Sequence, residues 1–293
     1  MGLIWRIGLI NCHISNRDNL EKFLVAVSLM KLDICAVVES WFKGGEGEGR
    51  MEERLRGTDW VWMGRDREGR RGGGVGFLAR REAEVRVAKT SRSEGLMWVE
   101  VEDGEGKFFV AVVYRAPGSF PSVREANQEL MDELSEDITF FREQGRIGIV
   151  GDFNCRIGEE ESRIVSEERG QQREKIYWRR SEDKKVSHGG RELVRFMNDH
   201  NMIILNGVKK KALFSSVQIR GNSVIDYIIS DQNLYQKMKN FKTWQEEISI
   251  VSDHRILTVE IEGSIRKQNF GRKSERKRKK EGGRRGEGME KGG

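Results

Sequence analysis

The sequence predicts a mixed α/β fold in which two packed β-sheets lie between outer helices, and three observations support this prediction. Strand-like apolar runs outnumber helical stretches, and the helices are interspersed among the strands. Several runs, such as Ile34–Val38, are continuously apolar, which is typical of strands buried on both faces. The 293 residues are enough to bury a core between two such sheets.

The strand-like runs are spread along most of the chain. The first seven are Ile4–Ile10, Ile34–Val38, Val61–Met63, Val75–Ala79, Trp98–Val101, Phe108–Val113 and Ile147–Val150. The last four are Ile203–Leu205, Leu213–Phe214, Val224–Ile229 and Ile256–Ile261. Helical periodicity appears in Leu20–Met30, Arg124–Phe141 and Arg191–His200, with Asn19 and Ser122 as the expected caps of the first two helices.

Connections between these elements are rich in glycine and charge. Gly44–Gly49 and Gly69–Gly74 are two examples. Gly72–Gly76 lacks the Lys-Ser/Thr pair of a phosphate-binding loop, so we interpret it as a tight connection into a buried strand. The longest connection, Arg156–Gly190, is expected to be irregular. In it, Tyr177-Trp178 lies near basic residues and could either stack on DNA or belong to a mobile loop.

The net charge of +6 comes from the end of the chain. Residues 263–293 hold 12 Lys/Arg and 4 Asp/Glu, a balance of +8, which leaves −2 for residues 1–262. We therefore predict a folded domain at 1–262 and a basic disordered tail at 263–293. The Arg276–Lys280 run could bind nucleic acid, act as a nuclear import signal or be a solvated linker.

Composition excludes several classes of protein. Hydrophobic residues make up 37% and charged residues 34%, and no apolar run reaches the roughly 18–20 residues that span a bilayer, so no membrane partner is expected. A strand-like segment follows Met1 almost at once, so secretion is not expected. We predict an intracellular, nuclear location, for which Arg276–Lys280 is the candidate import signal. Cys12, Cys35 and Cys155 fit a reducing compartment and lack zinc-ligand spacing.

Short polar motifs stand at the ends of apolar runs, where mixed α/β folds build reaction sites. In chain order they are Ile10-Asn11, Val37-Val38-Glu39-Ser40-Trp41, Val112-Val113-Tyr114-Arg115, Gly151-Asp152-Phe153-Asn154, Ser223-Val224-Ile225-Asp226-Tyr227 and Val251-Ser252-Asp253-His254. Their carboxylates, amides, phenol and imidazole suit a divalent metal and phosphoryl chemistry better than redox chemistry or acyl transfer.

Two of these motifs supply the groups for a metal and a water. Glu39 at a rigid strand end is the best candidate ligand for a hard cation, and Asn11 could support the metal or Glu39, or form a turn. Asp152 and Asn154 are two residues apart after a strand, so their side chains can point to the same side. They could activate and orient a water, hold a phosphate, or form an Asx turn.

The ordered set resembles the endonuclease/exonuclease/phosphatase superfamily, and most closely the apurinic-type endonuclease domain of non-LTR (LINE-like) retrotransposons. The likeness runs from about Trp5 to Glu262. Phe214-Ser215-Ser216, Gly72–Gly76 and Tyr114-Arg115-Ala116-Pro117 point to the retroelement branch. The resemblance implies a DNase I-like, four-layer sandwich of two mixed sheets flanked by helices.

The resemblance also implies roles for individual residues. Asp152 would activate the water with Asn154 as its polar partner, and Glu39 would hold the metal with Asn11 and Asp253 at its side. Asp226 would pair with His254, whose imidazolium donates to the phosphate. An acid expected shortly after Asn11 is replaced here by His13 or its neighbours.

Three further residues complete the predicted site. Tyr114 could donate to a phosphate or leaving-group oxygen, or be a packed aromatic. Arg115 and Ser223 are the predicted substrate-binding residues, although the Ser223 hydroxyl could instead face solvent. The remaining histidines, His13, His188 and His200, are expected to be structural or solvated.

These observations predict a Mg²⁺-dependent DNA endonuclease, with Mn²⁺ as a possible substitute, that nicks target DNA for retrotransposition. It would act as a monomer on DNA, with a reverse transcriptase module encoded elsewhere. Two alternatives remain open: another phosphodiesterase of the superfamily acting on RNA or a small phosphoester, and a decayed or domesticated nucleic-acid-binding domain.

Overall fold

The computed structural model describes residues 3–42, 51–65, 73–168, 171–219, 221–244 and 252–264, and the structural statements below concern these residues. The predicted Gly44–Gly49 connection, the first part of the Gly69–Gly74 connection and the predicted tail from residue 265 onward, including Arg276–Lys280, lie outside them. Among the described helices, none has the length and apolar character needed to span a membrane.

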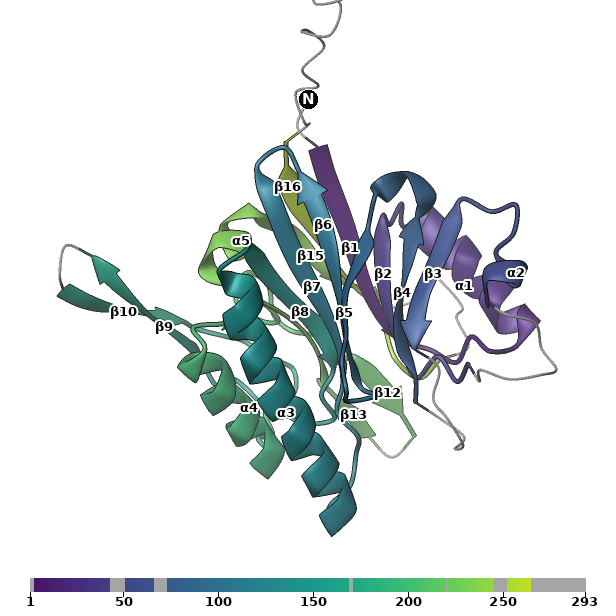
Figure 1. Ribbon diagram of the computed structural model, residues 1–293. Helices are drawn as coiled ribbons and strands as arrows, with labels where there is room; N and C mark the ends of the chain where they lie inside the picture. Colours follow the sequence, from purple (N-terminus) through teal and green to yellow (C-terminus); the bar gives the residue numbers. More distant parts are fainter. Residues whose placement is uncertain are drawn as a thin grey trace, which may run out of the picture.

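Two six-stranded sheets pack face to face with helices outside, which confirms the predicted four-layer α/β sandwich (Figure 1). From edge to edge, the first sheet consists of β15 (Met238–Thr243), β16 (Leu257–Gly263), β1 (Leu3–Asn11), β2 (Ile34–Val38), β4 (Val75–Arg80) and β3 (Trp60–Arg65). The second consists of β11 (Ile203–Ile204), β14 (Asp226–Ser230), β8 (Arg146–Asp152), β7 (Gly106–Tyr114), β6 (Leu96–Asp103) and β5 (Arg86–Thr90).

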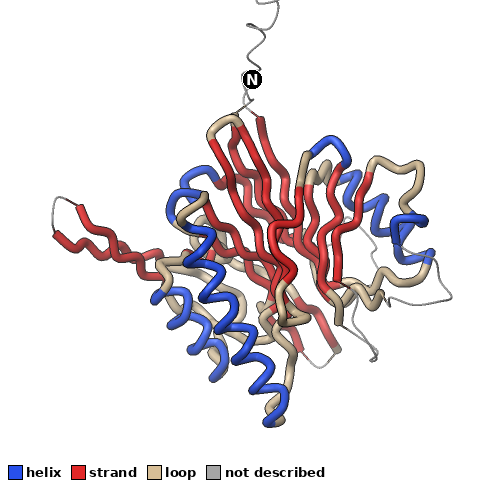
Figure 2. Tube along the Cα trace, in the orientation of Figure 1, coloured by secondary structure: helices blue, strands red, loops and turns tan. Residues whose placement is uncertain are grey.

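Helices cover the outer faces of the two sheets (Figure 2). The covering helices are α1 (Arg17–Leu29), α2 (Met51–Arg54), α3 (Pro121–Arg142) and α4 (His188–Asp199), and a 3₁₀ turn lies at Arg81–Ala83. The short helix α5 (Gln232–Lys237) instead packs Leu234 into the cluster between the two sheets. The largest apolar cluster joins both sheets through residues such as Phe77 and Val110. Phe23 of α1 packs on the first sheet, and Leu134 of α3 and Leu193 of α4 pack on the second.

The helix starts differ from the predicted caps. The side chain of Asn16, not Asn19, caps α1 by accepting a hydrogen bond from the Asn19 amide at 2.8 Å. Asn19 instead donates from its side chain to the His13 carbonyl. The helix α3 begins at Pro121, whose fixed φ suits a first helical position, so Ser122 lies inside the helix and is not its cap.

The central part of the Arg156–Gly190 connection is regular, contrary to the prediction. The strands β9 (Ser162–Glu168) and β10 (Gln171–Tyr177) form an antiparallel ribbon that projects from the body (Figure 1). Five of the seven residues of β10 are exposed, so the segment carries no apolar run. Tyr177 is buried against Tyr235, and only Trp178 of the predicted aromatic pair is exposed.

The prediction of a strand at Leu213–Phe214 is wrong. The Phe214 amide donates to the Glu182 side chain and its carbonyl accepts from Arg255, so side chains take the place of a strand partner. The neighbouring strands are β12 (Ser216–Gln218) and β13 (Gly221–Ser223), which form a short antiparallel hairpin. The predicted strand at Val224–Ile229 begins only at Asp226. The segments β5, β15, α2 and α5 were not predicted, because they are short or largely polar.

Candidate active site

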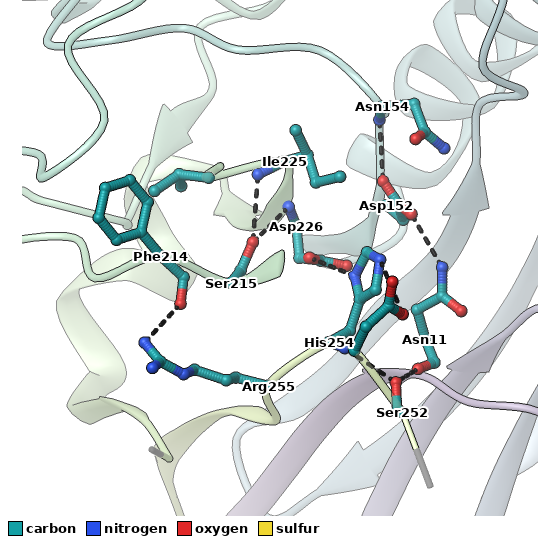
Figure 3. Close-up of polar contacts among 12 residues, drawn as sticks. Asn11, Asp152, Asn154, Phe214, Ser215, Ile225, Asp226, Ser252, His254 and Arg255 are labelled. Atoms are coloured by element: carbon teal, nitrogen blue, oxygen red, sulfur yellow. Dashed lines mark hydrogen bonds and ion pairs between the residues drawn. The ribbon is translucent and has the colours of Figure 1, made fainter. Parts of the chain in front are cut away.

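The ends of several strands meet at one edge of the sandwich, and the predicted residues Asn11, Asp152, Asp226 and His254 lie there (Figure 3). The strands β1 and β2 run parallel, and their register places Asn11 beside the residue that precedes Glu39. The parallel pair β7 and β8 sets Tyr114 opposite Asp152. The antiparallel pair β8 and β14 sets Asp152 opposite Asp226. Strand pairing therefore brings these groups together within each sheet, and the packing of the two sheets sets Asn11 against Asp152.

Asp152 is buried, and both of its carboxylate oxygens accept hydrogen bonds. The Asn154 backbone amide donates to Oδ1 at 2.9 Å, and Nδ2 of Asn11 donates to Oδ2 at 2.9 Å (Figure 3). Gly151 lets β8 approach β7 closely, because a Cβ there would lie 2.1 Å from the Val113 carbonyl oxygen. Asn154 has φ 47°, which Asn tolerates better than most residues. The turn at Asn154 therefore orients the Asp152 carboxylate at the end of β8.

Asp226 and His254 form the pair that the resemblance implied. Nδ1 of His254 lies 2.8 Å from Oδ2 of Asp226, and their side chains are 6% and 2% exposed (Figure 3). The carboxylate therefore fixes the ring so that Nε2 is the nitrogen left to face a ligand. Within the described part of the chain, Oδ1 of Asp226 is buried and has no hydrogen-bond partner.

Two serine hydroxyls hold this pair in place, and neither had a role in the sequence analysis. The Ser215 hydroxyl accepts from the backbone amides of Ile225 and Asp226, both at 3.1 Å (Figure 3). The Ser252 hydroxyl donates to the Asn11 carbonyl at 2.5 Å and accepts from the His254 amide at 2.9 Å. Both serines stand inside the quoted motifs, but their partners become apparent only in the folded chain.

A buried amide, Asn206, is the third residue that sequence reasoning missed. It donates to the Asp226 carbonyl and accepts from the Ile228 amide, both at 3.0 Å, beside the short strand β11. Ser223 takes part through its backbone, since its carbonyl accepts from the Ser215 amide at 3.0 Å. The hydroxyl that orders the Asp226 segment is therefore that of Ser215 rather than that of Ser223.

Glu39 lies at the same edge but belongs to a second hydrogen-bonded group. The Tyr114 hydroxyl donates to its Oε1, and the Trp41 indole N–H donates to its Oε2 at 3.3 Å. Asp253 is exposed and accepts from the Gln218 side chain at 2.7 Å, while its other oxygen lies 4.0 Å from Nε2 of His254. Of the predicted metal ligands, Asn11 therefore contacts Asp152 and Asp253 lies near His254, while Glu39 is held by Tyr114 and Trp41.

Arg115 points away from the carboxylates. Its guanidinium contacts the Gly189 carbonyl at 3.3 Å and Glu192 at 3.1 Å. Its side chain lines a cleft of about 810 Å³ between α3 and α4, and Asn154 lines the same cleft. The Asn154 side chain donates to the Arg115 carbonyl at 3.0 Å. Arg115 therefore contacts the edge of the site through its backbone carbonyl, while its guanidinium binds Gly189 and Glu192 instead.

Burial and charge shift the protonation of the central groups. Burial and the neighbouring charge of Asp226 raise the pKa of Asp152 to about 8, against the opposing effect of His254. Burial alone would lower the pKa of His254, but the carboxylates of Asp226 and Asp152 outweigh it and raise this pKa to about 9. At neutral pH His254 is therefore an imidazolium, which is the form that donates to an anion.

The donor set fits a divalent cation. Among the described residues, Asp152, Asp226 and His254 offer ligand atoms that all lie within 4.8 Å of one another. Oδ1 of Asp226 is a buried acceptor without a hydrogen-bond donor among the described residues, and a hard cation could bind it. The three cysteines are buried and form no disulfide, and none of them joins the ligand atoms of this group in the manner of a zinc centre.

The raised pKa of His254 predicts a pH-dependent stability. Because the folded-state pKa of about 9 lies above the ordinary value of 6.5, the stabilisation is complete below pH 6.5 and is lost as the pH rises through 9. The free energy of unfolding, measured by urea denaturation in EDTA, should fall by on the order of 2 kcal/mol over that range. The His254→Gln variant should show a smaller fall, which leaves the part that Asp152 contributes as the pH rises to about 8, and an equal fall in the variant would contradict the assignment.

Residues 108–258, which are 151 of the 293, match the family described as "Endonuclease-reverse transcriptase". The matched region contains Tyr114, Asp152, Asp226 and His254. The chain belongs to this family. No curated protein matches the chain. Membership confirms the predicted relation to the endonuclease/exonuclease/phosphatase superfamily on more than half of the sequence.

Solved structures of nucleases share the fold. One is the endonuclease domain of TRAS1, a telomere-specific non-LTR retrotransposon (12% identity, TM-score 0.61, 88% of this chain and 98% of that one). Others are the 3′-5′ exonuclease NExo from Neisseria meningitidis (16%, 0.61, 87% and 99%) and the AP endonuclease LMAP from Leishmania major (11%, 0.64, 88% and 88%). At these identities the similarity concerns the fold, and it confirms the DNase I-like sandwich.

Proposed function

We propose that this chain is a Mg²⁺-dependent endonuclease that nicks DNA, and that the nick serves retrotransposition. The observation that carries the proposal is the buried cluster of Asp152, Asp226 and His254, with ligand atoms within 4.8 Å of one another. Two carboxylates buried together are costly unless a positive charge compensates them. The raised pKa of Asp152 reflects this cost, so the cluster suits a cation and the phosphate that a cation brings.

In this proposal each buried group has one task at the phosphodiester. Asp152, whose ionised form a nearby divalent cation would favour, accepts the proton of the attacking water, and burial together with Asp226 raises the pKa of this carboxyl and so its strength as a base. His254 donates from Nε2 to a phosphate oxygen, because its Nδ1 faces Asp226. Asp226 keeps the imidazole charged and oriented.

The remaining residues act at the edge of this centre. A divalent cation held by Glu39, Asn11 and Asp253 beside this cluster would neutralise negative charge on the phosphate. The Asn11 amide keeps Asp152 aligned through its hydrogen bond to Oδ2. Tyr114, whose hydroxyl donates to Glu39, links the carboxylate on β2 to the second sheet. Asn154 holds the backbone turn after Asp152.

Family membership supports a nuclease, and the TRAS1 domain supports a retrotransposon context. The chain spans 98% of that domain, whose title names a non-LTR retrotransposon. Another neighbour, NExo from Neisseria, is described bound to a product DNA hairpin, which supports DNA as the substrate. A reverse transcriptase module encoded elsewhere is the partner that a priming nick would require.

A substrate comparison tests the proposal. The protein is incubated with supercoiled plasmid, single-stranded RNA and a small phosphodiester in Mg²⁺, and nicked plasmid is then offered to a DNA polymerase. We expect open circles whose nicks carry 3′-hydroxyl ends that the polymerase extends. Hydrolysis of RNA or of the small ester without nicking of DNA would favour the other phosphodiesterase. Nucleic-acid binding without any hydrolysis would favour a decayed domain.

The Glu39→Gln variant should weaken metal binding more than DNA binding, because it removes ligand charge while preserving shape. The Mg²⁺ concentration for half-maximal nicking should rise by about tenfold, which corresponds to about 1.4 kcal/mol of lost binding. Glu21→Gln on the exposed surface of α1 is the matched control and should titrate like the wild type. An unchanged titration of Glu39→Gln would remove Glu39 from the metal ligands.

A further inference from the structure

The turn that follows β2 has an unusual backbone. Glu39 and Trp41 both have φ 54°, in the left-handed region that residues with side chains rarely adopt. Such conformations cost energy, and they persist only where the surrounding structure holds them. A bulky Trp at such a position, three residues after the end of the buried strand β2, therefore requires an explanation.

Backbone hydrogen bonds from two neighbouring segments hold this turn. The amides of Ser40 and Trp41 donate to the carbonyls of Gly74 and Gly73 at 3.2 and 3.0 Å. These glycines have φ values of 86° and 83°, a region open to glycine, and they lead directly into β4. The Ile14 amide donates to the Ser40 carbonyl at 3.2 Å from the other side. The glycine-rich connection predicted from the sequence thus supports the Glu39–Trp41 turn.

The strained turn aims the indole at the carboxylate beside it. Nε1 of Trp41 donates to Oε2 of Glu39 at 3.3 Å, while the Tyr114 hydroxyl donates to Oε1. The Trp41 ring also packs on the His13 ring, with centroids 4.5 Å apart and planes at 35°. Both Glu39 oxygens are therefore oriented, one from each sheet, and His13 supports the ring that orients the second.

A purely structural role does not account for Trp41. Its side chain is 38% exposed, so it removes less apolar surface from water than a buried tryptophan such as Trp98 does. Its backbone conformation is unfavourable, and its N–H is directed at a partly exposed carboxylate rather than at a buried acceptor. What the turn achieves is a fixed direction for the Glu39 side chain.

We propose that Trp41, supported by His13, is a positioning residue that holds the Glu39 carboxylate ready for a divalent cation. The proposal rests on the proposed function, because it assigns Glu39 to the metal. A free glutamate side chain loses rotational freedom when it binds a cation. Orienting both carboxylate oxygens beforehand removes much of that loss, so the cation binds more tightly.

The test measures Mn²⁺ binding by calorimetry on the full chain without DNA. Trp41→Phe keeps an aromatic ring on His13 and removes only the N–H donor. We expect its Mn²⁺ affinity to fall by about 3- to 10-fold, typical of one lost hydrogen bond to a charged group, with an unchanged melting temperature. His13→Ala, which removes the support, should lower the affinity by about 2- to 5-fold. Trp178→Phe at a 69% exposed position is the matched control and should bind like the wild type.

Nicking kinetics provide the second readout. Trp41→Phe should raise the Mg²⁺ concentration for half-maximal nicking by the same factor and keep the rate at saturating Mg²⁺ within about twofold, since the residue acts through Glu39. Wild-type Mn²⁺ affinity in both Trp41→Phe and His13→Ala, with weakened binding in Glu39→Gln, would overturn the role of Trp41 and leave the proposed function intact. A wild-type protein that bound no Mn²⁺ and nicked no DNA would overturn both.

Discussion

The Asp152→Asn variant should nick DNA at least about 10²-fold more slowly than the wild-type protein, the usual scale for the loss of a general base. An amide of the same shape cannot accept the proton of the attacking water. It can still accept one of the two hydrogen bonds that now reach the carboxylate from Asn154 and Asn11. The measurement is the single-turnover rate at saturating DNA and Mg²⁺.

The melting temperature of the Asp152→Asn variant distinguishes a loss of catalysis from misfolding. Burial raises the pKa of Asp152 from 3.8 to about 8, so the folded state disfavours the ionised carboxylate, and stability is lost as the pH rises from about 3.8 to about 8. A neutral Asn removes this loss, so the variant should melt no lower than the wild type at pH 8. Asp18→Asn on the exposed surface of α1 should change neither property. A folded Asp152→Asn protein with near-wild-type turnover would refute the assignment of the base.

The second large effect is expected at His254. His254→Ala should lower the nicking rate by at least about 10²-fold, because it removes the imidazolium group that donates a hydrogen bond to the phosphate. Asp226→Asn should lower it by about 10- to 10²-fold, since the imidazole loses the partner that lies 2.8 Å from its Nδ1. The Asp226→Asn/His254→Ala double variant should be barely slower than His254→Ala alone, because both residues serve one interaction.

A double-mutant cycle on single-turnover rates tests this coupling. Multiplicative losses would show that Asp226 acts independently of His254, for example as a metal ligand only. His188→Ala is the matched control, since that histidine lies on the surface of α4 with an 83% exposed side chain. Its rate should equal that of the wild type.

The apolar strands could be predicted from the sequence, because burial on both faces leaves a direct mark on composition. The strand β2 matches its predicted bounds, and β8 ends at the predicted site residue Asp152. The ribbon β9–β10 could not be predicted in this way, since β10 is mostly exposed and lacks an apolar run. Its strands pair with each other outside the main sheets, so neither apolar periodicity nor continuous apolar runs describe them.

The site residues form two groups, those that the sequence predicts and those that only the folded structure reveals. Asp152 and Asp226 could be predicted because each stands at a strand end, and strand register then brings them together. Ser215, Ser252 and Asn206 could not, since their hydroxyls and amide act on backbone groups that only the folded chain brings close. A serine or asparagine with such a role has the same local sequence as one in an ordinary turn.

The measurement that tests the central claim most directly is the conversion of supercoiled plasmid to open circles. It compares the wild-type protein with Mg²⁺, the wild-type protein with excess EDTA, and the Asp152→Asn variant purified in the same way. The buried Asp152–Asp226–His254 cluster predicts rapid nicking with Mg²⁺, none in EDTA and at least about 10²-fold slower nicking by the variant. Nicking that persisted in EDTA, or that the variant performed at the wild-type rate, would contradict a metal-dependent reaction at this cluster.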